Sequence, residues 1–344
     1  MNIILALIIF SVIILFHELG HFLLAKYNDV KVNEFCLGLG PTLFGVTKGE
    51  TKYSLKLLPF GGACMMEGED EESVDDRSFN SKTVPQRISI VAAGPVFNFI
   101  MAFAFSLILV GSVGFDRPVL TGVKEGFPAQ EAGIREGDEI VKLGNKKIHL
   151  YREVSVYTYF HAGEDIEVTY KRDGKTHTAV LTPKYDEESG SYLMGIYGTT
   201  ARSKGSALET LRYSAYEVKY WITSTIESLG QLIRGRVSVN EMSGPVGIVK
   251  VIGDTYTQAK SDGVFMVFLN MLNMCILLSA NLGVMNLLPI PALDGGRLVF
   301  LVVEAVRGKR MDPNKEGALN FVFLMALMAL MVVIMFNDIR KIVM

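Results

Sequence analysis

Four uncharged stretches dominate the pattern of apolar and polar positions along the chain. Three of them are longer than the roughly 20 residues that an α-helix needs to cross a bilayer. The fourth, at the N-terminus, is long enough only if its helix continues through HELGHFLLA to Ala25, which places three ionisable residues at membrane depth. Such residues are costly in lipid and are candidates for function. The pattern predicts four transmembrane helices: 1–25, 88–115, 263–293 and 317–337.

A cleaved signal peptide is the alternative interpretation of the first stretch. Its start lacks the Lys or Arg of a signal peptide, and no small-x-small cleavage site follows it. A charged HELGH block is also unexpected in a segment that is discarded. We therefore expect residues 1–25 to remain as a span.

The segments between the spans have patterns of their own. Residues 26–87 contain short apolar runs, VNEFCLGLGP and TKYSLKLLPFGG, whose Gly and Pro boundaries predict strands and turns. The acidic run 67–76 is predicted to be a solvated surface loop. Residues 121–183 alternate like a small β domain with a hairpin turn at 173–175. Apolar positions at helical spacing over 205–234 predict an amphipathic helix on the protein or membrane surface.

Composition and charge indicate a membrane protein and its orientation. Hydrophobic residues make up 49% of the 344 residues, and the mean hydropathy is +0.31. The net charge of −2 gives no indication of a nucleic-acid surface. Eight Lys and Arg in 26–87 and five in 294–316 place both segments in the cytoplasm by the positive-inside rule. Segment 116–262 is then expected outside, and because it contains no cysteine, no disulfide framework is predicted there.

The HELGH block at 17–21 has the His-Glu-x-x-His pattern of a metal site. On a helix, His17 and His21 lie on one face one turn apart, so both rings can bind one zinc ion. Glu18 stays close enough to act as general base on a water activated by the metal. A chance match is the alternative, because the bare pattern occurs in unrelated chains. Two histidines and a glutamate are poor packing residues in an apolar helix, which favours the metal site.

A catalytic zinc ion needs a third protein ligand and one open position. The three remaining histidines all lie in segment 116–262, which is expected on the far side of the membrane. Asp294 is the better candidate, because two prolines in NLLPIPALDGG break the third span just before it and two glycines follow it. The alternative is that Asp294 is simply the first residue of the cytoplasmic loop.

Three of the asparagines within the predicted spans are candidates for a structural or a catalytic role. Asn281 and Asn286 precede Asp294 in the third span, and Asn98 lies in the second. Amides at membrane depth commonly hold helices together. They can instead hydrogen-bond a substrate backbone or the oxyanion of a reaction, and the sequence leaves both interpretations open.

The motifs together resemble those of the site-2 proteases, in particular the RseP-type bacterial regulators of intramembrane proteolysis. They occur in family order from the first span to the end of the third. HELGH paired with a distant LDGG is a specific signature, whereas HELGH alone is not. The matching pieces are HELGH at 17–21, GLGP at 38–41, KLLPFGG at 56–62, AAGPVFNF at 92–99, SGPVGI at 243–248 and NLLPIPALDGGRL at 286–298.

The resemblance implies an α-helical polytopic membrane protein with about four transmembrane helices. It also implies a membrane-associated, re-entrant β loop and one extracytoplasmic PDZ-like β-rich domain. GFPAQEAGIREGDEIVKLGNKKI at 126–148 resembles the core of such a domain, and only one copy fits in the segment. Besides the four spans, the expected segments are a cytoplasmic β loop at 26–87, the PDZ-like domain at 116–199, an extracytoplasmic amphipathic helix and linker at 200–262, and a cytoplasmic loop at 294–316.

The implied activity is that of a zinc metalloendopeptidase that cuts transmembrane segments of single-span proteins, such as anti-sigma factors or signal-peptide remnants. The resemblance implies His17, His21 and Asp294 as ligands of one zinc ion per chain, Glu18 as the catalytic acid/base, and substrate binding by Asn281 and Asn286. The expected location is the plasma membrane, with the active site near the cytoplasmic side. The expected partners are the lipid bilayer and substrates already trimmed by another protease, without nucleic acid.

Two other functions compete with this one. The first is a membrane scaffold that recruits peptides through its PDZ-like domain and has lost catalysis, which the intact HELGH and LDGG motifs argue against. The second is a metal transporter that uses the same ligands, but too few polar residues line the remaining spans to form a path. A zinc assay combined with cleavage of a model transmembrane substrate separates the three.

Overall fold

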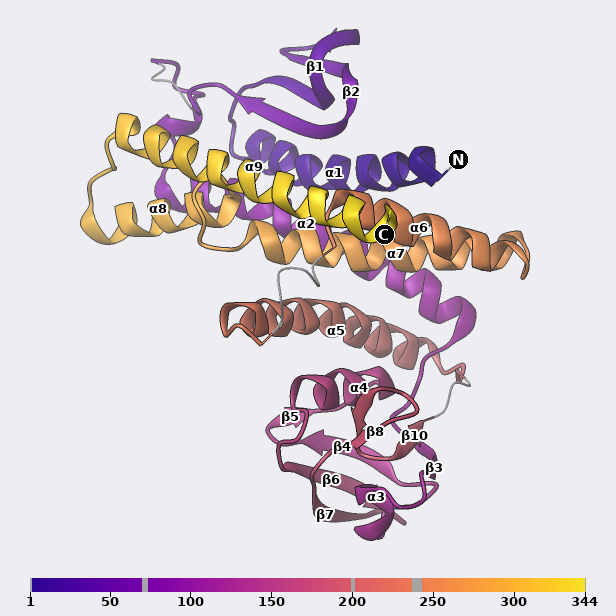
Figure 1. The fold of residues 1–344 in the computed structure, drawn as a ribbon. Coiled ribbons are helices and arrows are strands. Elements are labelled where there is room, and N and C mark those ends of the chain that lie inside the picture. Colours follow the sequence, from indigo (N-terminus) through magenta and orange to yellow (C-terminus); the bar gives the residue numbers. More distant parts are fainter. Residues whose placement is uncertain (1, 70–73, 199–201, 237–242, 344) are drawn as a thin grey trace. The chain divides into compact units, whose positions relative to one another are not determined.

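The computed structural model describes residues 2–69, 74–198, 202–236 and 243–343 (Figure 1). The chain divides into two compact units. Unit 1 comprises Met1–Phe105 and Leu232–Met344, and unit 2 comprises Ser106–Gln231. Each unit has a hydrophobic core of its own.

Helices make up most of unit 1. Within the described residues, four helices are long and apolar enough to cross a membrane, which confirms the predicted number of candidate spans. The structure adds two helices that the sequence did not predict, one before and one after the third candidate span. The helices are α1 (Asn2–Tyr27), α2 (Val84–Val113, whose end lies in unit 2), α6 (Pro245–Lys260), α7 (Val264–Asn286), α8 (Asp294–Arg307) and α9 (Pro313–Val343), with a 3-10 turn η1 (Phe79–Ser81).

The predicted strand-rich loop of unit 1 is a small sheet made by β1 (Val32–Lys48) and β2 (Thr51–Met66). Residues 34–37 of β1 lie between two parts of β2, because they pair with 52–55 on one side and with 62–65 on the other. The positive φ angles of Gly38 and Gly61, 90° and 86°, permit the bends that this arrangement needs. Residues 62–66 are consequently an edge strand, with no strand on their other side in the described part of unit 1.

Unit 2 contains the predicted small β domain. Its core is formed by buried residues of the sheet β5-β4-β6-β7 together with α3 and α4. The predicted turn at 173–175 joins β6 to β7. The elements are β3 (Leu120–Val123), α3 (Pro128–Glu131), β4 (Glu139–Leu143), β5 (Lys146–Lys147), α4 (Tyr151–Phe160), β6 (Ile166–Arg172), β7 (Lys175–Leu181), β8 (Lys184–Asp186), β9 (Ser191–Leu193), β10 (Ile196–Gly198) and α5 (Ala207–Ile233).

The helix predicted over 205–234 is α5, but most of its apolar stripe is not buried, with Val218 as an exception. Leu208 and Ile226 are exposed, whereas Ser214 and Glu217 are buried. Glu217 is buried because it accepts a hydrogen bond of 2.7 Å from the Arg152 guanidinium of α4, which is distant in sequence. Helix α5 thus packs on the β domain partly through its polar side.

Candidate zinc site

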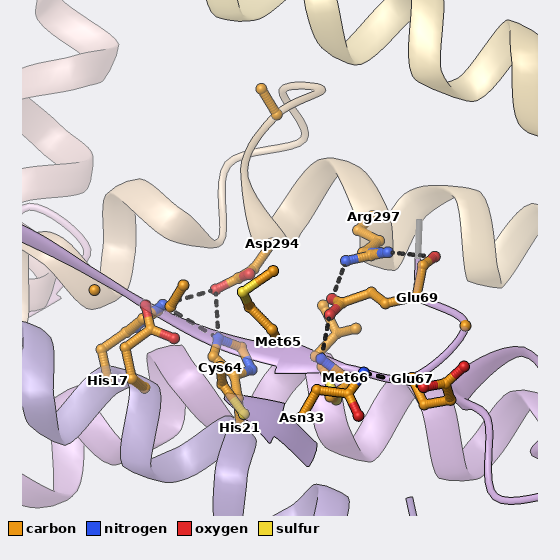
Figure 2. A pocket seen from close by; sticks show the side chains of 16 residues that line it. His17, His21, Asn33, Cys64, Met65, Met66, Glu67, Glu69, Asp294 and Arg297 are labelled. Carbon is orange, nitrogen blue, oxygen red and sulfur yellow. Dashed lines mark hydrogen bonds and ion pairs between the residues drawn. The ribbon is translucent and has the colours of Figure 1, made fainter. Parts of the chain in front are cut away.

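The two histidines of HELGH present their Nε2 atoms to the same point, where the Asp294 carboxylate meets them (Figure 2). The two Nε2 atoms are 3.2 Å apart. Asp294 Oδ2 lies 3.2 Å from His17 Nε2 and 3.5 Å from His21 Nε2. Ligand atoms of a tetrahedral zinc site with bonds of 2.0–2.1 Å are about 3.3 Å apart. The three predicted ligands therefore lie together with the spacing that zinc requires.

Asp294 reaches this point because the chain breaks between α7 and α8. Helix α7 ends at Asn286, and the segment with the two prolines leads to Asp294 in the first turn of α8. A Cβ atom on Gly295 would lie 2.2 Å from the Leu288 carbonyl oxygen, and one on Gly296 would lie 2.3 Å from that of Ile290. The two glycines of LDGG therefore let this segment fold tightly against the start of α8.

The other ring nitrogens of the two histidines have partners of their own. His21 Nδ1 lies 2.9 Å from the Ile90 carbonyl oxygen, and His17 Nδ1 lies 3.1 Å from Asn98 Nδ2. Metal-binding histidines usually have such a second contact, which fixes the ring and the tautomer. Asp294 Oδ2 is buried without a hydrogen-bond partner in the described structure, as expected for an atom whose natural partner is a cation.

Gly94 provides the space for the histidine rings. A Cβ atom at this position would lie 2.3 Å from His21 Nε2 and 2.7 Å from His17 Cε1. Only glycine lets α2 lie this close to the two rings. Two imidazole nitrogens, one carboxylate oxygen and the space beside Gly94 fit a zinc ion.

A cavity of about 750 Å³ adjoins the three ligands. The edge strand 62–66 forms part of its wall, and a Cβ on Gly62 would be 3.0 Å from Glu18 Cγ. Glu18 and Cys64 of the edge strand both line this cavity. The general base predicted from the sequence therefore lies between the ligands and a strand edge.

Two acidic residues of this cavity were misinterpreted from the sequence. Glu67 and Glu69 belong to the run predicted as a solvated surface loop, of which residues 70–73 lie outside the described structure. Both line the cavity, and the Arg297 guanidinium of α8 contacts the Glu69 carboxylate and, at 3.1 Å, its backbone oxygen. Figure 2 shows this pair beside the ligands. The only sequence signal was Arg297 itself, three residues after Asp294 in LDGGR.

One of the two predicted asparagines of α7 lies beside the ligands. Asn286 Nδ2 lies 3.4 Å from His17 Nε2, next to the proposed metal position. Asn281 is half-buried in α7, and neither of the two asparagines is among the described residues that line the cavity. Asn98, for which the sequence left two roles open, is fully buried and contacts His17.

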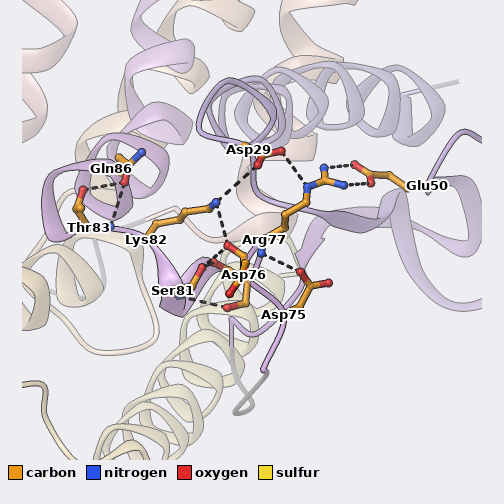
Figure 3. A network of polar contacts seen from close by, with 10 residues as sticks. Asp29, Glu50, Asp75, Asp76, Arg77, Ser81, Lys82, Thr83 and Gln86 are labelled. Carbon is orange, nitrogen blue, oxygen red and sulfur yellow. Dashed lines mark hydrogen bonds and ion pairs between the residues drawn. The ribbon is translucent and has the colours of Figure 1, made fainter.

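A polar network ties the sheet to the end of α1 (Figure 3). Arg77 donates two hydrogen bonds to Glu50, of 2.6 and 2.9 Å, and one of 2.9 Å to Asp29 just after α1. Lys26 of α1 also contacts Glu50. Hydrogen bonds from Arg77 and Lys26 lower the pKa of Glu50 to about 2, so this carboxylate stays charged across the physiological range.

Solved structures from Listeria match one quarter of the chain. The PDZ domain of the SdrC-like protein of Listeria monocytogenes is 22% identical with a TM-score of 0.22, and the match covers 24% of this chain and 88% of that chain. The second domain of the Listeria protein Lin2157 is 25% identical with a TM-score of 0.22, covering 25% and 87%.

Sequence relatives cover nearly the whole chain. A protein of Clostridium acetobutylicum is 39% identical over 338 residues, 98% of this chain and 97% of its own. Zinc metalloprotease RasP of Bacillus licheniformis is 31% identical over 426 residues, 99% of each chain, and the regulator of sigma-W protease RasP of Bacillus subtilis is 30% identical over 418 residues, 97% of each. The family model of peptidase family M50 matches residues 5–330. The chain therefore belongs to peptidase family M50, the site-2 proteases, and is a zinc metalloprotease.

Proposed function

We propose that this protein hydrolyses peptide bonds inside the transmembrane segments of single-span membrane proteins. One observation carries the proposal: three ligand atoms at zinc spacing lie beside Glu18 and a strand edge, in a unit whose long helices are suited to lipid. In this proposal His17, His21 and Asp294 hold one zinc ion per chain, and Glu18 is the general base.

The residues of the chain divide the chemistry between them. His17, His21 and Asp294 would hold the zinc ion, which would supply the Lewis acidity that peptide hydrolysis needs. Glu18, on the cavity wall, takes the proton of the attacking water and delivers it to the leaving amide nitrogen. The Asn286 amide, 3.4 Å from His17 Nε2, donates to the oxygen on which negative charge develops. Asn281 lies farther along α7 and contacts the substrate helix away from the cut.

A transmembrane substrate must unwind before it can be cut. Its carbonyl groups are bound in helical hydrogen bonds, and an unsatisfied backbone group costs several kcal/mol in hydrocarbon. In this proposal the unwound substrate pairs with the edge strand 62–66, which forms part of the cavity wall. Exposed Leu39, Leu43 and Phe44 support the placement of this sheet against lipid.

Helix-weakening residues near the cut should therefore favour cleavage. The test uses two model substrates in liposomes that differ only at the cut region, one Leu-rich and one with Gly and Asn inserted. We expect faster cleavage of the second. Equal rates at equal membrane insertion would show that unwinding does not limit selection.

We propose that the β domain of unit 2 selects substrates and takes no part in the chemistry. A cavity of about 440 Å³ lies within this unit between α4 and the segment 190–197, and a strand such as β10 can accept a peptide by edge pairing. The domain acts by gripping the peptide or by excluding bulky proteins. Deletion of 121–199 should leave zinc binding intact, and loss of zinc in that variant would contradict this division.

The proposed substrates are membrane proteins such as anti-sigma factors, because the relative from Bacillus subtilis is named a regulator of sigma-W protease. We further propose a multi-pass location in the plasma membrane, with unit 2 outside, the active site near the cytoplasmic side, and substrates that another protease has already trimmed. The decisive experiment compares membrane-protein fragments in cells that carry the wild type or Glu18→Gln. Identical fragment patterns would overturn the proposed function.

A further inference from the structure

The tautomer of His17 decides whether this residue can bind a metal through Nε2. A neutral imidazole carries one proton, so the hydrogen bond made by one ring nitrogen fixes the state of the other. The backbone fixes the tautomer of His21, because its Nδ1 lies 2.9 Å from the Ile90 carbonyl oxygen, which can only accept a hydrogen bond. Nδ1 of His21 therefore holds the proton, and its Nε2 keeps a free lone pair.

His17 depends on a side chain instead. Its Nδ1 lies 3.1 Å from the Asn98 amide nitrogen, and Asn98 Oδ1 is buried without a partner in the described structure. With the amide nitrogen on that side, Nδ1 accepts and the proton moves to Nε2, where it occupies the lone pair that a metal needs. The two ends of an amide have nearly equal size, and their assignment follows the hydrogen bonds they make. A half-turn of the amide places Oδ1 against Nδ1–H and restores the Nε2 lone pair.

We propose that Asn98 is a positioning residue of the zinc site, whose amide oxygen accepts the Nδ1–H of His17 and directs the Nε2 lone pair to the metal. This inference rests on the proposed function, because it assumes His17 as a ligand. Its consequence is that Asn98 turns its Oδ1, not its Nδ2, toward His17 Nδ1 when zinc is bound.

The surroundings of Asn98 suit this role. The residue is 0% exposed, and it lies on α2 four residues after Gly94, which borders the same rings. Its backbone oxygen accepts a hydrogen bond of 2.8 Å from Ser279 Oγ on α7. This hydrogen bond between α2 and α7 is made by the main chain of Asn98, which leaves its side chain to His17. An asparagine that only joined helices would be expected to use its amide for that contact.

The test measures zinc affinity by competition with a chelator, in the full-length protein in detergent. We expect Asn98→Ala to weaken zinc binding roughly 10–100-fold, as is typical when the second partner of a ligand is lost. Asn98→Asp should bind zinc at least as tightly as the wild type, because a carboxylate is a stronger acceptor for Nδ1–H. Wild-type affinity in a folded Asn98→Ala protein, or weakened binding in Asn98→Asp, would overturn the proposal.

Ser279→Ala is the matched control. It removes the hydrogen bond to the Asn98 backbone and leaves the side chain in place. This variant should lower the melting temperature without changing zinc affinity, whereas a purely structural Asn98 would make the two variants behave alike. If Asn98→Ala does not fold, Asn98→Asp decides alone. His17→Ala separates this inference from the proposed function. Wild-type zinc binding in that variant would show that His17 is not a ligand and would contradict the proposed zinc site.

Discussion

Buried carboxylates in the two units differ in their hydrogen-bond partners. In unit 2, Asp138 is fully buried and receives two hydrogen bonds from Arg172, of 2.6 and 2.7 Å, and one of 3.0 Å from the Arg135 N–H. Glu217 is likewise bound by Arg152 and by the Trp221 indole N–H. Both carboxylates have the partners that a buried charge requires.

In unit 1, Asp294 Oδ2 is the one buried carboxylate oxygen of the described structure that has no hydrogen-bond partner. Its position in the unit is not the cause, because Asp338 of α9 is also buried there and accepts a hydrogen bond of 2.8 Å from the Gly247 N–H. This difference distinguishes carboxylates that stabilise the fold from carboxylates that bind a ligand. A carboxylate with all its partners holds a fold together, whereas one that faces two imidazoles and lacks a partner indicates a ligand that the chain itself does not supply.

The largest effect should follow from Asp294→Ala. We expect zinc affinity to fall by more than the roughly 100-fold that outer partners contribute, and cleavage to be lost with it, because two histidines do not make a stable site. The metal-free fold should not lose stability, since an incompletely partnered charge is removed. Bound zinc per chain and thermal unfolding without metal measure both effects. Stoichiometric zinc in this variant would place the site elsewhere.

Glu18→Gln should separate metal binding from chemistry. The amide keeps the size of the side chain but cannot take a proton, so cleavage should fall on the order of 10²–10⁴-fold while zinc stays bound. Cleavage rate and zinc content are measured on the same sample. Turnover at the wild-type rate would exclude Glu18 as the base.

Asp138→Ala should lower the stability of unit 2 and leave zinc binding unchanged, the opposite of the result expected for Asp294→Ala. Removing one partner of a buried ion pair costs about 3–5 kcal/mol, and we expect the lower end because the Arg172 side chain keeps 19% exposure. Denaturant unfolding of the β domain measures this loss, and zinc affinity should not change. A concurrent drop in zinc affinity would mean that the two units depend on each other.

A smaller effect is expected from acid. Burial alone would raise the pKa of Asp138, but hydrogen bonds from Arg172 and from the Arg135 N–H outweigh it and hold the pKa below its usual range. This stabilisation is complete above the unfolded pKa of about 3.9 and is lost as pH falls through the lower folded pKa. The melting temperature of the β domain should fall below about pH 4 in the wild type. A curve of the same shape for Asp138→Asn would assign the acid sensitivity to another group.

Local spacing predicted some parts of this molecule well. His17, Glu18 and His21 follow from one helical turn, and the strands of 26–87 follow from short runs between glycines and prolines. Asp294 required the motif around it, because the sequence alone allowed a simple loop residue. The comparisons with known proteins establish the family and leave the individual roles of these residues as predictions.

Contacts between distant segments could not be predicted. The helical spacing of apolar residues predicted the apolar stripe of α5 but not the side that packs on the β domain. That side contains Glu217, which binds Arg152, 65 positions away. Glu69 looked like part of a solvated run because its partner Arg297 lies 228 positions later. The partner of His17 on α2 was one of two open interpretations of Asn98, and only the packing of α1 against α2 distinguishes them.

Gly94 also has a genetic consequence. Every glycine codon becomes an alanine codon by one base change, and the added methyl group would occupy the space 2.3 Å from His21 Nε2. The ligands and the general base would all remain in the sequence, so a search for HELGH and LDGG would still report an active protease. A copy of this gene that encodes an inactive protein would then be identified by the residue at position 94 in α2, not by its metal-binding motifs.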